Sequence, residues 1–350
     1  MYYYIIKRLL LMIPTLLGIL FLTFVVTQFV PGGPVEQLAN QLTSLNVSGE
    51  ASSGSANLYR GSSGLSEEHI ESLKEFYGFD KPFLERFTDL VINYLSFDLG
   101  DSYFHHQSVS ELIISKLPVS ISLGLWTFLI IYSICIPLGI KKAVSHGSNF
   151  DLTSSTLILI GYSVPGFVLG ISLIVLLGGG SFYDVFPTRG IISDNWDELT
   201  IGAKVLDYLW HMTLPIISSV IGSFAVMTML TKNSFIEEIK KKYVLTAKAK
   251  GLHPLKALIK YPLRTSLNPF IADIGNMLPQ IISGSAIVSM VLSLPTTGPM
   301  LISALQSQDM YLAGSFLIFL AMLTVIGMFL SDLALAWLDP RIRLGGGASK

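Results

Sequence analysis

The sequence predicts an all-α membrane protein with six transmembrane helices and both termini in the cytoplasm. Three observations lead to this fold class. The 350 residues have a mean hydropathy of +0.60 and only 13% charged residues, against about 25% in an average soluble domain. Apolar stretches long enough to cross a bilayer, which takes about 20 residues as a helix, recur along the chain. Lysine and arginine gather in one segment, residues 232–264.

The predicted spans are apolar in their central parts and are separated by polar or Pro/Gly-containing segments. They cover residues 9–30, 118–140, 152–177, 213–231, 269–294 and 312–337. Lys7 and Arg8 precede the first span like the start of a secretory signal. However, the apolar run is longer than a signal core and no small-residue cleavage site follows it, so we expect a retained helix. Prolines inside the spans favour kinks; they are Pro14, Pro137, Pro165, Pro215 and Pro279.

Orientation follows from the lysines and arginines of the loops, which favour the cytoplasmic side. With six spans, 16 of the 23 basic residues lie on the side that holds both termini, and 7 lie in two longer loops on the other side. Both termini are therefore expected in the cytoplasm. The predicted organisation is a first helix (1–30), an extracytoplasmic region (31–117), a core of five helices with the basic loop 232–264 (118–338), and a cytoplasmic tail (339–350).

The extracytoplasmic region contains two features that need interpretation. Residues 40–64 are rich in Ser, Gly and Asn, which is typical of a flexible insertion, and helical patterning resumes at residues 66–69. His105 and His106 suggest a metal site, but neighbours on a helix point apart and no Cys or other His clusters with them. We therefore interpret them as part of a solvated loop. The single cysteine, Cys135, lies inside a span and is expected to be a small buried residue.

Charge is almost absent from the predicted spans. Asp273 and Asp332 lie towards the ends of spans five and six, and no histidine occupies a central position in any span. An ion-coupled secondary carrier commonly places ionisable groups near the middle of the membrane, and a membrane enzyme or respiratory subunit needs ligating or acid–base clusters. The sequence therefore argues against both classes, which remain the alternatives to a transporter powered by another chain.

The basic segment between spans four and five is predicted to form two short amphipathic helices. Ser234 and Glu237 have the spacing of a capping box, and helical signals continue to Lys250, with one apolar face of Ile236, Ile239, Tyr243 and Ala247. Gly251 fits the left-handed position after a helix, and Pro254 fits the first turn of the next one. Leu255, Leu258 and Ile259 give that second helix an apolar stripe.

Two interpretations fit this pattern. A basic amphipathic segment lies on anionic lipid headgroups, or it inserts into a groove on a soluble partner. Residues 243–252 favour the second, because they resemble the "EAA" loop of bacterial ABC importer permeases in its peptide-permease form, which docks on the ATPase subunit. Pro262 and Arg264 depart from the family's usual ending of this loop.

The resemblance extends over most of the chain. Motifs similar to those of B-type dipeptide/oligopeptide permeases occur at residues 5–11 with Pro14-Thr15, and at residues 31–34, 97–102, 117–120, 294–299 and 339–343. The Ser/Gly-rich insertion and residues 228–235 are most similar to the YejB-type subgroup, which is associated with oligopeptide uptake and with microcin C uptake. The chain is thus identified as a permease subunit of a dipeptide/oligopeptide ABC importer.

This resemblance implies a type I ABC importer permease fold in the bacterial inner membrane. It implies a second homologous permease subunit, two ABC ATPase domains that bind ATP and Mg, and an extracytoplasmic peptide-binding protein as partners, with membrane lipid around the spans and no nucleic acid. The chain itself is expected to be no enzyme and to hold no cofactor or metal. A dipeptide or another small solute remains the alternative substrate. The expected ATPase-coupling residues are Tyr243, Thr246, Ala247, Ala249, Lys250, Gly251, Leu252 and Leu255.

Substrate-binding residues stay unknown at this level. Small residues in spans three and five favour close helix packing, with pathway lining as the alternative; they are Gly161, Pro165, Gly166, Ser283, Gly284 and Ser285. The sequence contains no phosphate-binding Gly-x-x-x-x-Gly-Lys-Ser/Thr loop, in agreement with ATP being bound by another chain.

Overall fold

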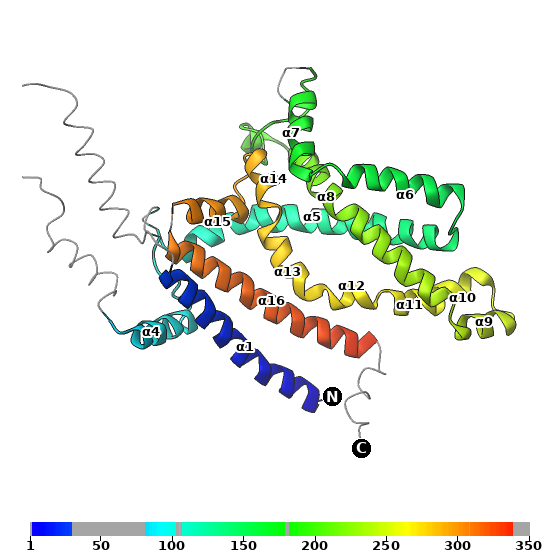
Figure 1. Ribbon diagram of the computed structural model, residues 1–350. Helices are drawn as coiled ribbons and strands as arrows, with labels where there is room; N and C mark the ends of the chain where they lie inside the picture. The colour runs from blue at the N-terminus through cyan, green and yellow to red at the C-terminus, as the bar shows by residue number, and fades with distance from the viewer. Residues whose placement is uncertain are drawn as a thin grey trace, which may run out of the picture. The chain divides into compact units, whose positions relative to one another are not determined.

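The computed structural model describes residues 2–29, 81–102, 105, 107–178, 182–307 and 309–338. These residues are mostly α-helical, and within them the β-structure consists of isolated bridges. The helices are shown in Figure 1; they are α1 (Tyr2–Phe29), α4 (Phe83–Leu95), α5 (Val109–Val144), α6 (Asn149–Tyr162), α7 (Gly166–Leu177), α8 (Ile201–Ile239), α9 (Lys242–Ala249), α10 (Pro254–Lys260), α11 (Pro262–Ser266), α12 (Asn268–Ala272), α13 (Ile274–Ser283), α14 (Ala286–Val291), α15 (Thr297–Gln306) and α16 (Met310–Leu338).

The described residues contain five helical segments long and apolar enough to cross a membrane: Ile5–Val26, Val109–Val144, Ile201–Ile239, Ile274–Val291 and Tyr311–Leu338. A sixth is formed if the bent pair α6–α7 counts as one span. The all-α membrane prediction is confirmed. The long helices extend beyond the predicted spans, since α8 begins at Ile201 and ends at Ile239 where residues 213–231 were expected.

The third predicted span is not one continuous helix. α6 and α7 are separated by a break of three residues and meet at 84°. Pro165 is the residue before α7 and has φ −57° and ψ 138°, a backbone conformation outside the α-helical region. The helix is therefore interrupted at Pro165 and does not continue through it with a kink. Gly166 then starts α7 against α8, since a Cβ built on Gly166 would lie 2.5 Å from the carbonyl oxygen of Ser218. The packing role expected of Gly166 is confirmed.

The fifth predicted span, residues 269–294, is also interrupted. It consists of α12, α13 and α14, which can be followed in yellow and orange in Figure 1. Gly284 ends α13 with φ +55°, and nothing lies within 4 Å of the Cβ position. Glycine is favoured at this position because it adopts a positive φ without steric cost. Among the described residues no neighbouring helix lies close to its Cβ position, so the prediction that Gly284 permits close packing is wrong. The close approach is instead made by Gly275 and Gly327, where the backbones of α13 and α16 meet.

The chain divides into two compact units. The first comprises residues 1–13, 116–300 and 320–350. Its apolar core joins α5, α8 and the segment around α14 through Leu123, Met212, Leu214, Ile216, Val288, Leu292 and Leu294. A buried polar link crosses this core, because the Thr297 backbone N–H donates to Ser120 Oγ at 2.8 Å and Thr297 Oγ1 donates to the Ile282 carbonyl at 2.6 Å. Cys135 is fully buried, as expected.

The second unit comprises residues 14–115 and 301–319. Here α4 packs on the end of α1 through aromatic rings, and Asp309 caps α16, since Asp309 Oδ1 accepts the Leu312 backbone N–H at 3.1 Å. Ser102 Oγ donates to the other oxygen of Asp309 at 2.5 Å and also contacts His105 Nδ1 at 3.1 Å. The insertion at 40–64, the helix start at 66–69, His106 and the tail at 339–350 lie outside the described residues.

Candidate functional site

The basic segment begins where α8 ends. α8 runs through Ser234 to Ile239, so the capping box predicted at Ser234 is wrong, and so is the single apolar face from Ile236 to Ala247. Lys240 ends α8, and the extended backbone of Lys241 (ψ 146°) turns the chain into α9. The turn is braced by the buried carboxylate of Glu238, which pairs with the Lys241 ammonium and accepts a hydrogen bond from the Tyr243 hydroxyl.

The turn between α9 and α10 has the geometry predicted from Gly251. Gly251 has φ +81°, and its N–H donates to the Lys248 carbonyl at 3.0 Å. The N–H of Leu252 donates to the Ala247 carbonyl at 3.2 Å. These two bonds form a Schellman ending, in which the residue after the cap adopts the left-handed conformation that glycine favours. Pro254 then occupies the first turn of α10, as predicted.

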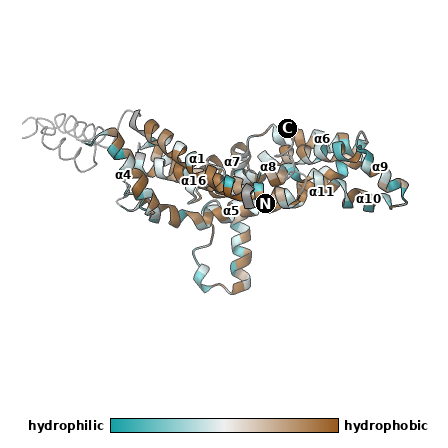
Figure 2. Ribbon diagram, turned by 90° about the horizontal axis from the view of Figure 1, so that it is seen from below, coloured by the Kyte–Doolittle hydropathy of each residue, from teal (hydrophilic) through white to brown (hydrophobic). Residues whose placement is uncertain are grey.

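Most of the surface of α9 and α10 is exposed, although the two helices pack on each other. Val244 and Ala257 are fully buried, whereas Leu245, Leu255 and Ile259 are 62, 61 and 57% exposed. Lysines lie around these leucines, and Figure 2 shows hydrophilic residues gathered on α9 and α10. The structure thus leaves three large apolar side chains exposed within a basic surface.

The residues expected to couple fall on this surface with two exceptions. Ala247 and Leu252 are half-buried at the turn, and the others are exposed: Tyr243, Thr246, Ala249, Lys250, Gly251 and Leu255. The expectation missed Leu245 and Glu238. Leu245 follows the buried Val244, and only the break after α8 decides which of these two apolar residues faces out. Glu238 was placed on an unbroken helix and so was not expected at a turn.

After α10 the chain returns to the helical core by a third short helix. α10 ends at Lys260 and α11 starts at Pro262, which is buried and packs with α11 against α8. The Tyr261 ring meets the Tyr243 ring edge-on at 6.4 Å, which holds the two ends of the loop together. Arg264 Nη2 donates to the Leu338 carbonyl at the end of α16, at 2.6 Å. Pro262 and Arg264, which depart from the usual family pattern, therefore fix where the loop rejoins the core.

A buried charge cluster lies about two helical turns before this loop along α8, and the sequence did not reveal it. Asp151, at the start of α6, is 2% exposed and pairs with Lys232 of α8 at 2.7 Å and with Lys142 of α5 at 3.2 Å. Both lysines were expected only to orient the chain in the membrane. Asp151 is the acidic residue directly before the predicted third span, which could have suggested a buried ion pair. Nothing in the sequence says which basic residues it contacts.

The Lys142 ammonium and the Asp151 side chain have several hydrogen-bond partners in this cluster. The fully buried Lys142 ammonium donates to the Asp151 carbonyl at 2.9 Å, to Ser154 Oγ at 2.6 Å and to Ser155 Oγ at 2.8 Å. The Gly147 backbone N–H donates to Asp151 Oδ2 at 3.1 Å. A buried charge is tolerated when it is paired and hydrogen-bonded in this way. The cluster thus joins α5, α6 and α8 close to the point where α8 leads into α9.

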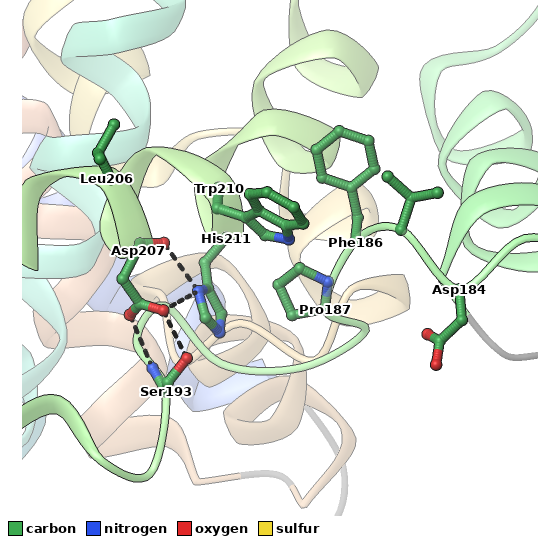
Figure 3. Close-up of a pocket in the computed structure, with 9 residues that line it drawn as sticks. Asp184, Phe186, Pro187, Ser193, Leu206, Asp207, Trp210 and His211 are labelled. Carbon is green, nitrogen blue, oxygen red and sulfur yellow. Dashed lines mark hydrogen bonds and ion pairs between the residues drawn. The ribbon is translucent and has the colours of Figure 1, made fainter. Parts of the chain in front are cut away.

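The other end of α8 lines a pocket of about 380 Å³. Figure 3 shows its polar side, where Asp207 accepts hydrogen bonds from the Ser193 backbone N–H at 2.9 Å and from Ser193 Oγ at 2.5 Å. His211 Nδ1 contacts the Asp207 carbonyl at 2.9 Å, and Trp210 packs near Phe186 with ring centroids 5.5 Å apart. These bonds fix the loop after α7 onto α8. Among the described residues no group of three His, Cys, Asp or Glu side chains is arranged to hold a metal ion.

Comparison with known proteins finds relatives that match nearly the whole chain. A family model described as "Binding-protein-dependent transport system inner membrane component" matches residues 135–344. The peptidoglycan transport system permease protein YejB of Agrobacterium fabrum is 48% identical, with 97% of each chain covered. The inner membrane ABC transporter permease protein YejB of Escherichia coli O157:H7 is 43% identical, with 98% of this chain and 99% of the relative covered. The dipeptide transport system permease protein DppB of Bacillus subtilis is 28% identical, with 97% and 98% covered.

Proposed function

The chain belongs to the family of inner-membrane components of binding-protein-dependent transport systems, and from that premise we propose that it translocates peptides across the inner membrane while α9 and α10 receive the work of separate ATPase subunits. It is a multi-pass membrane protein and a permease subunit of an ABC transport system. The observation that carries the coupling proposal is the exposed apolar surface of Leu245, Leu255 and Ile259 on a basic loop.

The proposed substrate class comes from the relatives. Their names refer to peptidoglycan, to dipeptides and to oligopeptides, and what these compounds share is a short chain of amino acids. We therefore expect short peptides, including peptides attached to other groups, to stimulate transport. Uptake of microcin C stays a prediction from the resemblance, and import of a dipeptide or another small solute stays the alternative.

The proposed mechanism uses the loop as a mechanical contact. ATP-driven closure of the ATPase subunits displaces α9 and α10, and the displacement passes through the braced turn at Glu238 into α8. With about 1.5 Å per residue, the 39 residues of α8 extend over roughly 58 Å. A single helix of this length carries movement from the loop to the opposite side of the membrane, where access to the pathway changes between two states.

The proposed assembly has a second, homologous permease subunit, two ATPase domains on the side of α9 and α10, and a peptide-binding protein on the other side. Both chain termini lie with the ATPase domains in this arrangement. Support comes from the family description, which refers to binding proteins, and from the excess of lysine and arginine on the side of the loop.

The test is reconstitution of the complex in lipid nanodiscs with measurement of peptide-stimulated ATP hydrolysis. Replacing Leu255 or Leu245 by Ser removes apolar area from the contact, and loss of one buried leucine is worth about 1.5–3 kcal/mol, so we expect ATPase binding to weaken at least about tenfold. Leu206→Ser is the matched control, because Leu206 is 70% exposed at the other end of α8.

Unchanged ATPase binding and unchanged stimulation in both loop variants would disprove the docking surface. If the same variants instead weakened binding of the isolated chain to anionic vesicles, the loop would be a lipid-binding segment. Stimulation by no peptide of any length, in a complex that still hydrolyses ATP, would contradict the proposed substrate class while leaving the coupling surface intact.

A further inference from the structure

Helix α4 carries three separate stripes of side chains. The first is aromatic and faces other helices: Phe83, Phe87 and Tyr94, at the helical spacing i, i+4, i+11. The second is polar: Glu85, Asp89 and Asn93. The third is apolar and exposed: Leu84, Ile92 and Leu95, with exposed fractions of 70, 60 and 77%. A helix that only packs on a protein needs the first two stripes, so the third requires its own explanation.

The aromatic stripe fixes one end of α4 on α1. The Phe83 ring lies 5.0 Å from the Phe24 ring and 6.3 Å from the Phe21 ring, and the Phe87 ring lies 5.5 and 5.4 Å from the same two rings. Phe21 and Phe24 belong to the last turns of the candidate span Ile5–Val26. α1 itself continues to Phe29, so at about 1.5 Å per residue the contact lies roughly 8–12 Å before the end of that helix.

The other end of α4 is fixed on α16. The Tyr94 hydroxyl and Ser315 Oγ form a hydrogen bond of 2.8 Å. Burial raises the pKa of Tyr94, in agreement with a dry contact. Ser315 is five residues into α16, which begins at Met310, so this contact lies roughly 8 Å from the start of that helix. The two contacts, about 16 Å apart along α4, therefore lie at similar distances from the ends of two helices that contain candidate spans.

An apolar stripe at this position meets a defined environment. An amphipathic helix in a membrane interface buries its apolar face about 5–10 Å into the boundary between headgroups and acyl chains, and α4 is held about 8–12 Å from the ends of α1 and α16. Phe97, just after α4, is 80% exposed and has φ +60°. Side chains other than glycine rarely adopt that conformation. The backbone N–H groups of Phe97 and Asp98 nevertheless close the helix end on the carbonyls of Tyr94 and Asn93, which keeps the aromatic side chain outside the protein.

We propose that α4 is an interfacial helix whose stripe of Leu84, Ile92 and Leu95, extended by Phe97, inserts among phospholipid acyl chains in the leaflet where α1 ends and α16 begins. The polar stripe then faces water, in agreement with the exposed Lys81–Asp89 pair at 2.7 Å. The charged residues of this stripe are acidic, so the attraction is to the apolar part of the lipid and not to anionic headgroups. This role is independent of the proposed substrate and of the coupling loop.

Spin labelling of the assembled complex in nanodiscs tests the proposal. Cys135 is the single cysteine of the chain, so Cys135→Ala gives a background for labels introduced by Leu84→Cys, Ile92→Cys and Leu95→Cys. Glu85→Cys and Asn93→Cys are the matched controls on the polar stripe of the same helix. Collisions of each label with oxygen, which concentrates in lipid, and with a water-soluble nickel chelate are measured by power saturation. Size-exclusion chromatography of the complex checks that each variant is assembled.

We expect the three apolar positions to show an oxygen-to-nickel collision ratio several-fold higher than the two polar positions. Equal, nickel-dominated collisions at all five positions would show that the stripe faces water. Protection of the apolar positions from both reagents, with immobilised labels, would show that a protein subunit covers it. Either of these results overturns the proposal.

Discussion

The two charged regions near the end of α8 differ in their exposure to solvent. In the Asp151 cluster the charges are enclosed, with Lys142 fully buried and Asp151 2% exposed. About two helical turns further on, the lysines of α9 and α10 are exposed, and the buried carboxylate of Glu238 braces the turn that connects α8 to α9. The enclosed cluster binds three helices to one another, whereas the exposed loop is free to meet a partner.

This difference shows how one helix can serve two purposes. A segment that receives a displacement from another protein must expose its surface to that protein. A segment that transmits the displacement must be rigid. The enclosed cluster links the ends of α5, α6 and α8, so in the proposed mechanism a displacement at α9 is passed to all three. Substitutions in the enclosed part are therefore expected to have larger effects than substitutions in the exposed loop.

The largest effect is expected from Asp151→Asn. The change leaves the Lys142 and Lys232 charges without their carboxylate, and breaking a buried ion pair costs at the lower end of its range about 3 kcal/mol. We expect a clear drop in the thermal stability of the purified protein, followed by fluorescence-detected size exclusion. The control is Asp184→Asn, which changes an exposed carboxylate and should leave stability within about 0.5 kcal/mol.

The double variant Asp151→Asn with Lys232→Met sharpens the same prediction. Removing both partners leaves no unpaired charge at Lys232, so the double variant should be more stable than the sum of the two single changes predicts. Simple additivity of the two losses would show that the pair at 2.7 Å contributes nothing as a pair.

The next effect concerns close helix contacts in the enclosed part. A Cβ built on Gly124 of α5 would overlap the backbone carbonyl of Ile281 in α13, and a backbone atom cannot move aside. Gly124→Ala should therefore destabilise the protein by about 2 kcal/mol, as overpacking does. Gly222→Ala in α8 is the matched control, because nothing lies within 4 Å of its Cβ position and alanine is the better helix former. Equal melting temperatures in the two variants would contradict the contact.

Sequence patterns predicted the helices well and their interruptions poorly. Apolar length alone located α1, α5, α8 and α16, because a bilayer imposes a minimum length that no soluble helix needs. The 84° break between α6 and α7 was expected only as a kink at Pro165. Whether a proline bends or ends a helix depends on what the freed backbone packs against, and here Gly166 lets α7 approach the Ser218 carbonyl.

A smaller effect is expected in the exposed loop from Gly251→Val. The φ of +81° with no atom near the Cβ position means that backbone conformation alone decides the outcome. A side chain in the left-handed region costs about 1–2 kcal/mol, and valine is poorly suited to it, so peptide-stimulated ATP hydrolysis should fall about tenfold. Gly251→Asn should retain most of the activity because asparagine tolerates this conformation. Equal activity of the valine and asparagine variants would refute the turn as a coupling element.

The candidate site was predictable where it depends on local rules. Gly251 and Pro254 were placed correctly because their backbone preferences do not depend on distant residues. Glu238 and Leu245 were missed, because no helix-stopping residue marks the break at Lys240 in the sequence. Asp151 was missed for a different reason: its partners are 9 residues before it in α5 and 81 residues after it in α8, and sequence spacing carries no information on contacts of that kind.

The smallest effect is expected from Tyr243→Phe. The change removes one hydroxyl that donates to Glu238 and leaves the Lys241 pair and the ring contact with Tyr261, so the loss is about 1 kcal/mol. A loosened turn should raise hydrogen exchange of the amides in α9 without changing exchange in the middle of α8, measured by mass spectrometry on the assembled complex. Thr246→Val, which removes an exposed hydroxyl bonded to the Lys242 carbonyl, is the control and should leave exchange unchanged. If exchange in α9 were the same in both variants, the turn at Glu238 would not be the element that joins the exposed loop to the enclosed cluster.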